Sequence, residues 1–293
     1  MRILATLALT CALTALAQQP SSQWAPVDKA MGRAGKAQPG DVYKYAMPRG
    51  DMQVSVAGTP IKAGLALGSW AAFKKMGNAA VVMGDLVLAD DEVEPVMLKL
   101  EQGGIEITAL HNHLLHETPR VLYMHIHGRG DAVKLATAIH DALALTKTPA
   151  AAPAPAASQS APTIDTAKVE AALGRKGTDA NGILQFSIPR AETITDSGIA
   201  VPPSMGVATG INFQPTGGGK AAITGDFVLL AKEVNPVIRA LRENGIEVEA
   251  LHSHMLTEQP RLFFMHFWAN DDAVKLAKGL RAALDQTKSA PAK

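Results

Sequence analysis

Hydrophobic and polar positions run through the same order twice along this 293-residue chain. In the first half, alternating apolar residues over 43–47 predict a strand that ends at Pro48, and the apolar run 81–88 predicts a second, buried strand. Apolar residues at 93, 96, 97 and 100 recur at helical spacing. They predict a helix over 91–102, with Asp90 or Asp91 as its cap and Gly103-Gly104 as its end.

Two further strands and a helix complete the predicted unit. A histidine-rich hairpin covers about 105–127, and a helix capped by Asp131 follows with an apolar stripe on one face. The same order recurs in the second half, where the last helix begins after Asp272. Strand, helix, hairpin and helix in this order predict an α+β fold: two tandem copies of an antiparallel sheet with helices packed on one face.

An Ala/Pro/Ser tract separates the two halves. It has no periodicity and no large side chain to bury, so it reads as a semi-extended linker that leaves each half able to fold alone. The expected segments are a signal peptide at 1–17, a first repeat at 24–146, the linker at 148–163 and a second repeat at 164–287.

The first residues have the pattern of a secretory signal. Arg2 precedes an apolar stretch that is too short to span a bilayer, and Ala15-Leu16-Ala17 fits the small-x-small cleavage rule. We therefore expect a periplasmic or secreted protein with no transmembrane segment in the mature chain. Thr10 before Cys11 is a poor match to a lipoprotein signal, so lipidation is the less favoured outcome.

Composition narrows the partners and the chemistry. The chain is 47% hydrophobic and 19% charged, with a net charge of +1, so nothing in the charge balance favours binding to nucleic acid. Cys11 is the only cysteine. A mature chain that begins at Gln18 has no disulfide, no thiolate metal ligand and no thiol nucleophile.

The histidines are the strongest functional signal. The segments 109–125 and 250–266 share three histidines at a constant offset of 141 positions (252 − 111). Clustered imidazoles at period-two spacing are typical of a transition-metal or proton-transfer site. The candidate metal ligands are His111, His113, His125, His127, His252, His254 and His266.

Strand alternation predicts how these rings meet. With a turn near Thr118, His111 lies opposite His125 and His113 opposite Tyr123, so each copy gathers its histidines into its own pocket. His127 is then an outer fourth ligand, which Trp268 replaces in the second copy. Four nitrogens against three predict tighter binding of Zn or Cu by the first copy. The alternative is a set of histidines that only hydrogen-bond one another and the backbone.

Other polar residues are candidates for a ligand-binding role. An additional carboxylate, or a contact to an anionic ligand, can come from Asp85, Glu117, Arg120, Asp226, Glu258 and Arg261. The competing interpretation is structural: Glu117 and Glu258 cap turn amides and pair with the neighbouring arginines, while the aspartates accept backbone N–H groups. His116 and His140 are replaced by Thr257 and Arg281 in the second copy, so we expect them on the surface.

The run H-x-H-x-L-x-E-x-P-R-x-x-x-x-H, followed by D-A-V-K-L-A, resembles the DUF1259 family of LppY/LpqO-like exported proteins. The segment Leu67-Gly68-Ser69-Trp70-Ala71-Ala72-Phe73 carries the same resemblance. It covers both copies and most of the chain. It implies an exported location and no activity, because the function of the family is unknown.

Three functions therefore remain open. One is a metal-binding protein whose partner is a metal ion or a small molecule. Another is a metal-dependent hydrolase or isomerase that uses one histidine site, and the third is a non-catalytic module that binds an envelope ligand. The sequence contains no G-x-S-x-G motif, which weakens the case for serine chemistry.

Overall fold

A computed structural model describes residues 23–150 and 163–291. The expected signal peptide at 1–17 and most of the linker at 148–163 lie outside these residues, so both remain predictions. The elements of the first copy are α1 (Ala25–Met31), β1 (Lys36–Gln38), β2 (Val42–Pro48), β3 (Val54–Val56), β4 (Thr59–Ile61), α2 (Ala63–Ala66), β5 (Gly68–Met76), β6 (Ala79–Ala89), η1 (Asp90–Glu92), α3 (Val93–Gln102), β7 (Glu106–His111), β8 (Glu117–Thr118), β9 (Val121–Gly130) and α4 (Ala132–Leu143).

The described residues of the second copy repeat this order, without elements equivalent to η1 and β8. Its elements are α5 (Thr166–Leu173), β10 (Thr178–Ala180), β11 (Ile183–Pro189), β12 (Thr195–Asp196), β13 (Ile199–Ala200), η2 (Pro203–Met205), β14 (Ala208–Gly217), β15 (Lys220–Leu229), α6 (Ala231–Glu243), β16 (Glu247–His252), β17 (Phe263–Asp272) and α7 (Ala273–Leu284).

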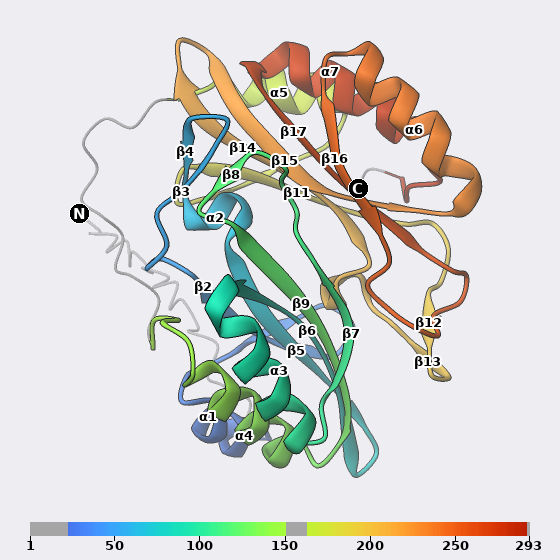
Figure 1. Ribbon diagram of the computed structural model, residues 1–293. Helices are drawn as coiled ribbons and strands as arrows, with labels where there is room; N and C mark the ends of the chain where they lie inside the picture. The colour runs from blue at the N-terminus through green and yellow to red at the C-terminus, as the bar shows by residue number, and fades with distance from the viewer. Residues whose placement is uncertain (1–22, 151–162, 292–293) are drawn as a thin grey trace, which may run out of the picture.

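Each copy is built on a six-stranded antiparallel sheet. The strand orders are β1-β2-β5-β6-β9-β7 and β10-β11-β14-β15-β17-β16, so equivalent strands occupy equivalent places. Three helices cover the outer face of each sheet: α1, α3 and α4 in one copy, α5, α6 and α7 in the other (Figure 1). The structure thus confirms the α+β class and the two tandem copies.

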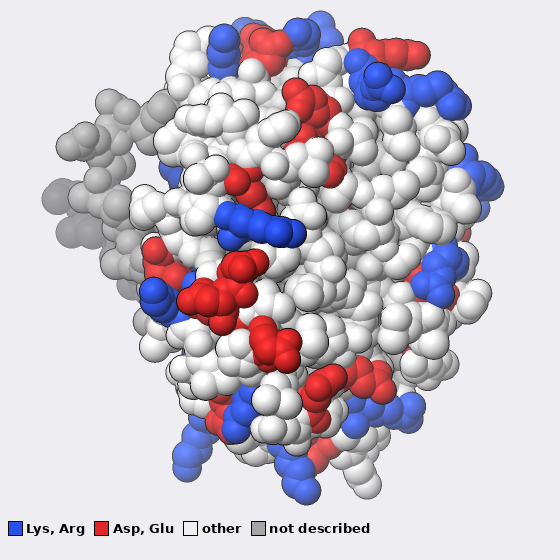
Figure 2. Space-filling view, viewed as in Figure 1, with Lys and Arg blue, Asp and Glu red and all other residues white. Residues whose placement is uncertain are grey.

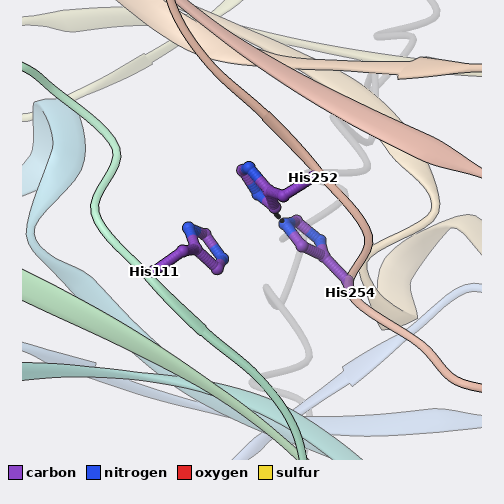
Figure 3. Close-up of side chains that lie close together, drawn as sticks. All are labelled: His111, His252 and His254. Carbon is purple, nitrogen blue, oxygen red and sulfur yellow. Dashed lines mark hydrogen bonds between the residues drawn. The ribbon is translucent and has the colours of Figure 1, made fainter.

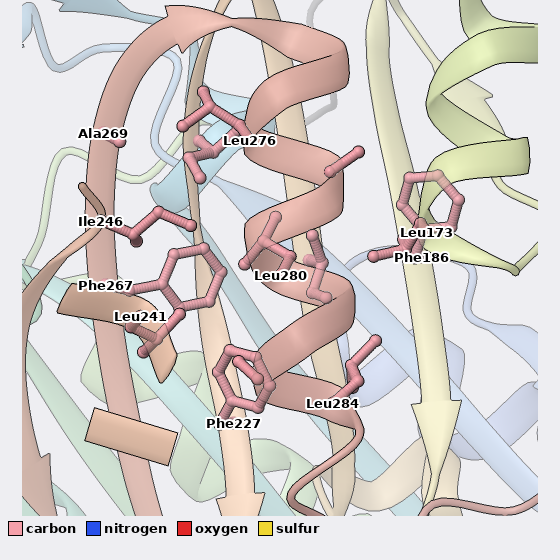
Figure 4. Close-up of a cluster of buried hydrophobic side chains, with 14 of the residues drawn as sticks. Leu173, Phe186, Phe227, Leu241, Ile246, Phe267, Ala269, Leu276, Leu280 and Leu284 are labelled. Atoms are coloured by element: carbon pink, nitrogen blue, oxygen red, sulfur yellow. The ribbon is translucent and has the colours of Figure 1, made fainter. Parts of the chain in front are cut away.

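Helices and sheet share one apolar core on the outer side of each copy. In the second copy, Leu276, Leu280 and Leu284 recur along α7 and pack against Phe227 and Phe267 of the sheet (Figure 4). The predicted caps of the last helix in each copy are confirmed. The Asp131 carboxylate accepts the backbone N–H groups of Val133 and Lys134, and Asp272 accepts that of Lys275.

The start of α3 differs from the prediction. Neither Asp90 nor Asp91 caps the helix; instead the Glu92 carboxylate accepts the N–H of Ala89. Glu92 is also held by Arg49, whose guanidinium is 1% exposed and donates to Glu92, Asp51 and the carbonyl of Val87. The buried guanidinium of Arg49 therefore explains why Glu92, and neither Asp90 nor Asp91, turns its carboxylate inward.

The inner faces of the two sheets face each other across a shared interior (Figure 1). Two apolar clusters there take residues from both copies. One combines Val81 and Met83 with Ile194 and Phe264, and the other combines Val56 and Tyr123 with Trp268. The two halves are therefore joined by these common clusters as well as by the linker. The composition of the linker did not indicate this packing.

A short arm from each copy reaches the sheet of the other. Lys62 in the first-copy arm donates its N–H to Gln214 of β14, and Asn212 of β14 donates to the carbonyl of Leu65. In return, Ser204 in the second-copy arm donates to the carbonyl of Pro39. Equivalent positions in the two arms are 140 residues apart in the sequence, whereas equivalent histidines are 141 residues apart. Ala57 and Ser197, which both have a positive φ, are such a pair (197 − 57 = 140).

The surface carries both signs of charge. On the face shown in Figure 2, acidic and basic side chains are interspersed among uncharged ones. None of the helices in the described ranges combines the length and the apolar character that crossing a bilayer requires.

Candidate metal centre

The inner faces of the central strands position the candidate ligands. On β6, Val81, Met83 and Val87 point to the interior between the sheets, and Asp85 lies on the same side by alternation. Its Cα pairs with Trp70 on one side and with His125 on the other. Gly84 beside it is required by close packing, because a Cβ there would come within 2.7 Å of the Trp70 carbonyl oxygen.

A β-bulge turns His111 toward the interior. The β7–β9 register shifts between Ile107 and Ala109, and the same shift occurs between Val248 and Ala250 in the second copy. Ile107 therefore packs on the helix side, although simple alternation places it on the histidine face.

The predicted cross-strand register also needs correction. His111 pairs with Tyr123, and Ala109 pairs with His125. The connection between the strands is longer than a tight turn, because β8 leaves the hairpin to pair with β3. The register moved by an even number of residues, so the facing of His111 and His125 was preserved.

The six repeated histidines meet in one cluster between the copies. The prediction of a separate pocket in each copy is corrected here, because the three shortest distances between the ring centroids of these histidines all cross the interface. His111 lies 3.6 Å from His252 between ring centroids, His113 lies 3.7 Å from His266, and His125 lies 3.6 Å from His254. Exchanging the copies maps this set of contacts onto itself, so the cluster lies on an approximate two-fold axis.

Figure 3 shows how three of these rings converge. His111 comes from the first copy and points toward His252 and His254 of the second. The Nε2 atoms of His252 and His254 lie 2.9 Å apart. Outside the cluster, Tyr123 stacks on His113 and Phe264 on His254, at equivalent positions of the two copies.

Four groups in this cluster have ligand atoms within 4.8 Å of one another. They are His111, His252 and His254; His111, His113 and His266; Asp85, His113 and His125; and Asp226, His254 and His266. Two groups combine one aspartate with two histidines of one copy, and the other two contain histidines of both copies.

Many polar atoms of the cluster are buried and lack a protein hydrogen-bond partner. They include the Nε2 atoms of His111, His113, His125 and His266, Nδ1 of His252, and one carboxylate oxygen each of Asp85 and Asp226. An unpaired buried polar atom is costly, and most such atoms in native proteins are satisfied. Nitrogen and carboxylate donors left open toward one another fit a bound cation.

Burial keeps the histidines neutral. It lowers the pKa of His111 to about 4, and burial together with the neighbouring His111 ring lowers the pKa of His266 to about 3. Burial raises the pKa of Asp85 to about 8, although the Lys44 ammonium acts in the opposite direction. Neutral imidazole is the form that binds a metal, so the histidines need no deprotonation near pH 7.

His127 lies apart from the cluster. Its Nδ1 is 3.4 Å from Glu106 and its Nε2 is 3.9 Å from Asp196, and it belongs to none of the four ligand groups. The expected fourth ligand of the first copy is therefore absent from the ligand groups of the described residues. The reason for tighter binding by that copy is lost with it. Trp268, its counterpart, is 4% exposed in the apolar interior.

The acidic and basic residues of the hairpin turns have a structural role. Glu117 accepts the N–H of Val121, and Glu258 accepts that of Leu262. Arg261 donates to Glu258 and to two turn carbonyls, while Arg120 is exposed. None of these four residues joins the ligand groups, whereas Asp85 and Asp226 do.

A small cavity of about 30 Å³ abuts the cluster on the first-copy side. Its lining includes His125 and His254 of the cluster together with Thr108, His127 and Asp196. This volume holds about one water molecule.

Sequence reasoning missed Asp196 and Glu249. Both are buried: Asp196 accepts a hydrogen bond from Thr257, and Glu249 accepts the N–H of Leu115 across the interface. Their counterparts in the other copy are Val56 and Thr108. The sequence signal that could have identified these two residues is the presence of a carboxylate in one copy where the other copy has none.

The tandem segments 25–145 and 167–286 match a family described as Domain of Unknown Function (DUF1259). The chain belongs to this family. No curated protein matches it. The histidine cluster is thus formed between two DUF1259 domains of one chain.

Likeness to solved structures is weak. The trimeric bacterial microcompartment shell protein PduB is 14% identical with a TM-score of 0.21, and EtuB from Clostridium kluyveri is 9% identical with a TM-score of 0.20. Each comparison covers 85% of this chain and 90% of the other. TM-scores this low do not indicate a shared fold.

Proposed function

We propose that the protein binds divalent transition-metal ions in the histidine cluster between its two copies. The observation that carries this proposal is that the cluster has buried, unpartnered imidazole nitrogens and carboxylate oxygens, on residues that form three-membered groups whose ligand atoms lie within 4.8 Å of one another. Coordination to bound cations satisfies such atoms. Without one, the protein bears the cost of several unpaired polar groups in its interior.

The donor set favours zinc or copper. Imidazole with an occasional carboxylate suits both ions, and the cluster contains no thiolate that would favour softer ones. The two groups that contain Asp85 and Asp226 share no residue, so the cluster has enough ligands for two ions. The pair His111 and His252 then lies between them and is available to both.

Metal analysis and calorimetric titration test this proposal. The metal-free full-length protein should take up Zn²⁺ or Cu²⁺ with a limit of two ions per chain. His111→Ala/His113→Ala removes ligands from three of the four groups and His252→Ala/His254→Ala from two, and each should weaken metal binding to those groups by more than about a hundredfold. Loss of outer partners alone already costs 10–100-fold.

The surface histidines provide a matched control. His116→Ala/His140→Ala removes the same number of imidazoles from exposed positions and should bind metal as the wild type does. Equal, weak binding by all four proteins would contradict the proposal. The cluster would then be a hydrogen-bonded polar interior.

A metal-dependent hydrolase or isomerase is the second candidate. The cavity beside His125 and His254 supports it, because the space admits one water molecule next to the ligands. A metal ion lowers the pKa of bound water and supplies a nucleophile near neutral pH.

We also propose that the protein is exported. Arg2 and the apolar run that ends in Ala15-Leu16-Ala17 support cleavage after Ala17. Intact-mass measurement of the protein from the cell envelope or medium tests this. Retention of Met1, or a lipid on Cys11, would contradict it.

A further inference from the structure

A solvent-facing groove of about 850 Å³ leads to the small cavity beside the cluster. Its lining includes Glu106, Thr108, His127, Asp196 and Thr257. Thr108, His127 and Asp196 line both the groove and the cavity, so they form the boundary between the two spaces. The cavity then reaches His125, whose Nε2 is buried without a partner. The three shared residues place the small cavity directly behind the groove, between solvent and the cluster.

The other end of the approximate two-fold axis is built differently. There Trp268 stands in the place of His127, and Val56 in the place of Asp196. Both belong to one apolar cluster of buried side chains. Glu249 replaces Thr108 and ties the two copies together by accepting the N–H of Leu115 at 2.6 Å. At this end two of the three equivalent positions thus carry apolar side chains, and the third carries a carboxylate that is used in a hydrogen bond between the copies.

The charge of the groove suits a cation. Its lining residues include the three carboxylates of Glu101, Glu106 and Asp196, and no lysine or arginine is among them. A cleft of one sign concentrates ions of the opposite sign and raises their rate of association. His127 stands between Glu106 and Asp196, with one ring nitrogen toward each.

We infer that this groove is a one-sided entrance for divalent metal ions, in which His127 and Asp196 capture a hydrated cation and pass it to His125 and His254. The inference rests on the proposed metal-binding function. His127 and Asp196 are transient contacts, because neither belongs to the ligand groups of the cluster. Their spacing of 3.9 Å allows an ion with part of its hydration shell to contact both.

The test measures how fast metal enters the metal-free full-length protein. Co²⁺ uptake is followed by stopped-flow visible absorption, and the final absorbance reports occupancy. His127→Trp/Asp196→Val places the residues of the closed end at the open end. We expect this variant to fill about tenfold or more slowly than wild type and to reach the same final occupancy.

Milder variants guard against misfolding. Asp196→Asn keeps an acceptor for Thr257, and Glu106→Gln changes a residue whose side chain is 71% exposed. Both should slow uptake and reduce its dependence on salt, since each removes one attracting charge. Trp268→Phe at the closed end is the matched control and should leave the rate unchanged.

Three results would overturn the inference. The first is wild-type uptake rates in His127→Trp/Asp196→Val and in both milder variants. The second is a lower final occupancy in Asp196→Asn, which would make Asp196 a permanent ligand. The third is slower uptake in Trp268→Phe. A wild-type protein that binds no cobalt, zinc or copper at equilibrium would instead refute the proposed function itself.

Discussion

At the scale of single residues, the cluster is a set of titratable groups held in their neutral forms. Six histidines and two aspartates lie together in the interior, and burial opposes charge on all of them. The same burial that makes the histidines ready for a metal makes their protonation costly. Acid should therefore act on this site before it acts on the rest of the fold.

The metal-free protein should lose stability as the pH falls from 6.5 toward 4. Burial lowers the pKa of the cluster histidines below 6.5, to about 4 for His111, so in this range the unfolded chain binds more protons than the folded one. Asp85 has the opposite effect on stability: because its pKa is raised to about 8, its contribution to the free energy of unfolding is lost as the pH rises from 3.8 through 8. The six histidines outnumber the two aspartates, so we expect the melting temperature to fall on acidification.

The double variant His111→Gln/His252→Gln isolates this effect. It removes two of the titrating rings, so its melting temperature should fall less steeply between pH 6.5 and 4 than that of the wild type. Parallel curves for the two proteins would show that the cluster histidines do not contribute to acid sensitivity.

At the scale of elements, a buried arginine ties strands and helices together in each copy. Arg49 follows β2, donates to the Val87 carbonyl of β6 and pairs with Glu92 before α3. Glu92 in turn accepts the N–H of Lys147, which follows α4. Arg190 and Glu233 repeat the arrangement, with Val228 and Lys288 as partners. Pro48-Arg49 and Pro189-Arg190 occupy equivalent positions in the two copies of the sequence, but the sequence does not show which carboxylates pair with these arginines.

Arg49→Met should destabilise the protein by about 3–5 kcal/mol, because it leaves the Glu92 carboxylate buried without its charged partner. Urea unfolding measures the change. Lys99→Met is the control, since Lys99 and Asp141 form an exposed pair that should contribute no more than about 1 kcal/mol. Arg49→Met/Glu92→Gln should recover part of the loss. Similar midpoints for Arg49→Met and Lys99→Met would mean that Arg49 is not structurally important.

At the scale of the molecule, the two copies form a five-layer arrangement: helices, sheet, shared interior, sheet and helices. The shared interior combines apolar clusters from both copies with the histidines. The proposed metal binding is expected to be coupled to the association of the copies, because a ligand that binds only the assembled state stabilises that state.

Cleavage within 151–162 should leave the two halves associated. The common clusters bury apolar surface of both copies, so the cut fragments should elute together from a sizing column. Residues 24–146 produced alone should aggregate or unfold. Zn²⁺ should raise the melting temperature of the cut complex, since the cluster needs both halves. Two stable, separately eluting fragments would restore the sequence-based expectation of independent domains.

The local pattern of the chain determined much of the fold. Alternation over 43–47, helical spacing over 93–100 and the caps Asp131 and Asp272 each act through contacts a few residues away, so they could be read directly. The tandem repeat extended these predictions to the second copy. It also identified six histidines and Asp85 and Asp226 as candidates that the fold brings together.

Tertiary structure alone decided where these candidates meet. The bulge at Thr108, the strand pairing that lengthens the hairpin and the choice of Glu92 over Asp90 all depend on partners distant in sequence. So does the largest difference from the prediction: one histidine cluster across the interface instead of one pocket per copy. Complementary apolar surfaces and the two arms determine how one sheet packs against the other. The periodicity within one copy does not encode which residues of the other copy it will contact.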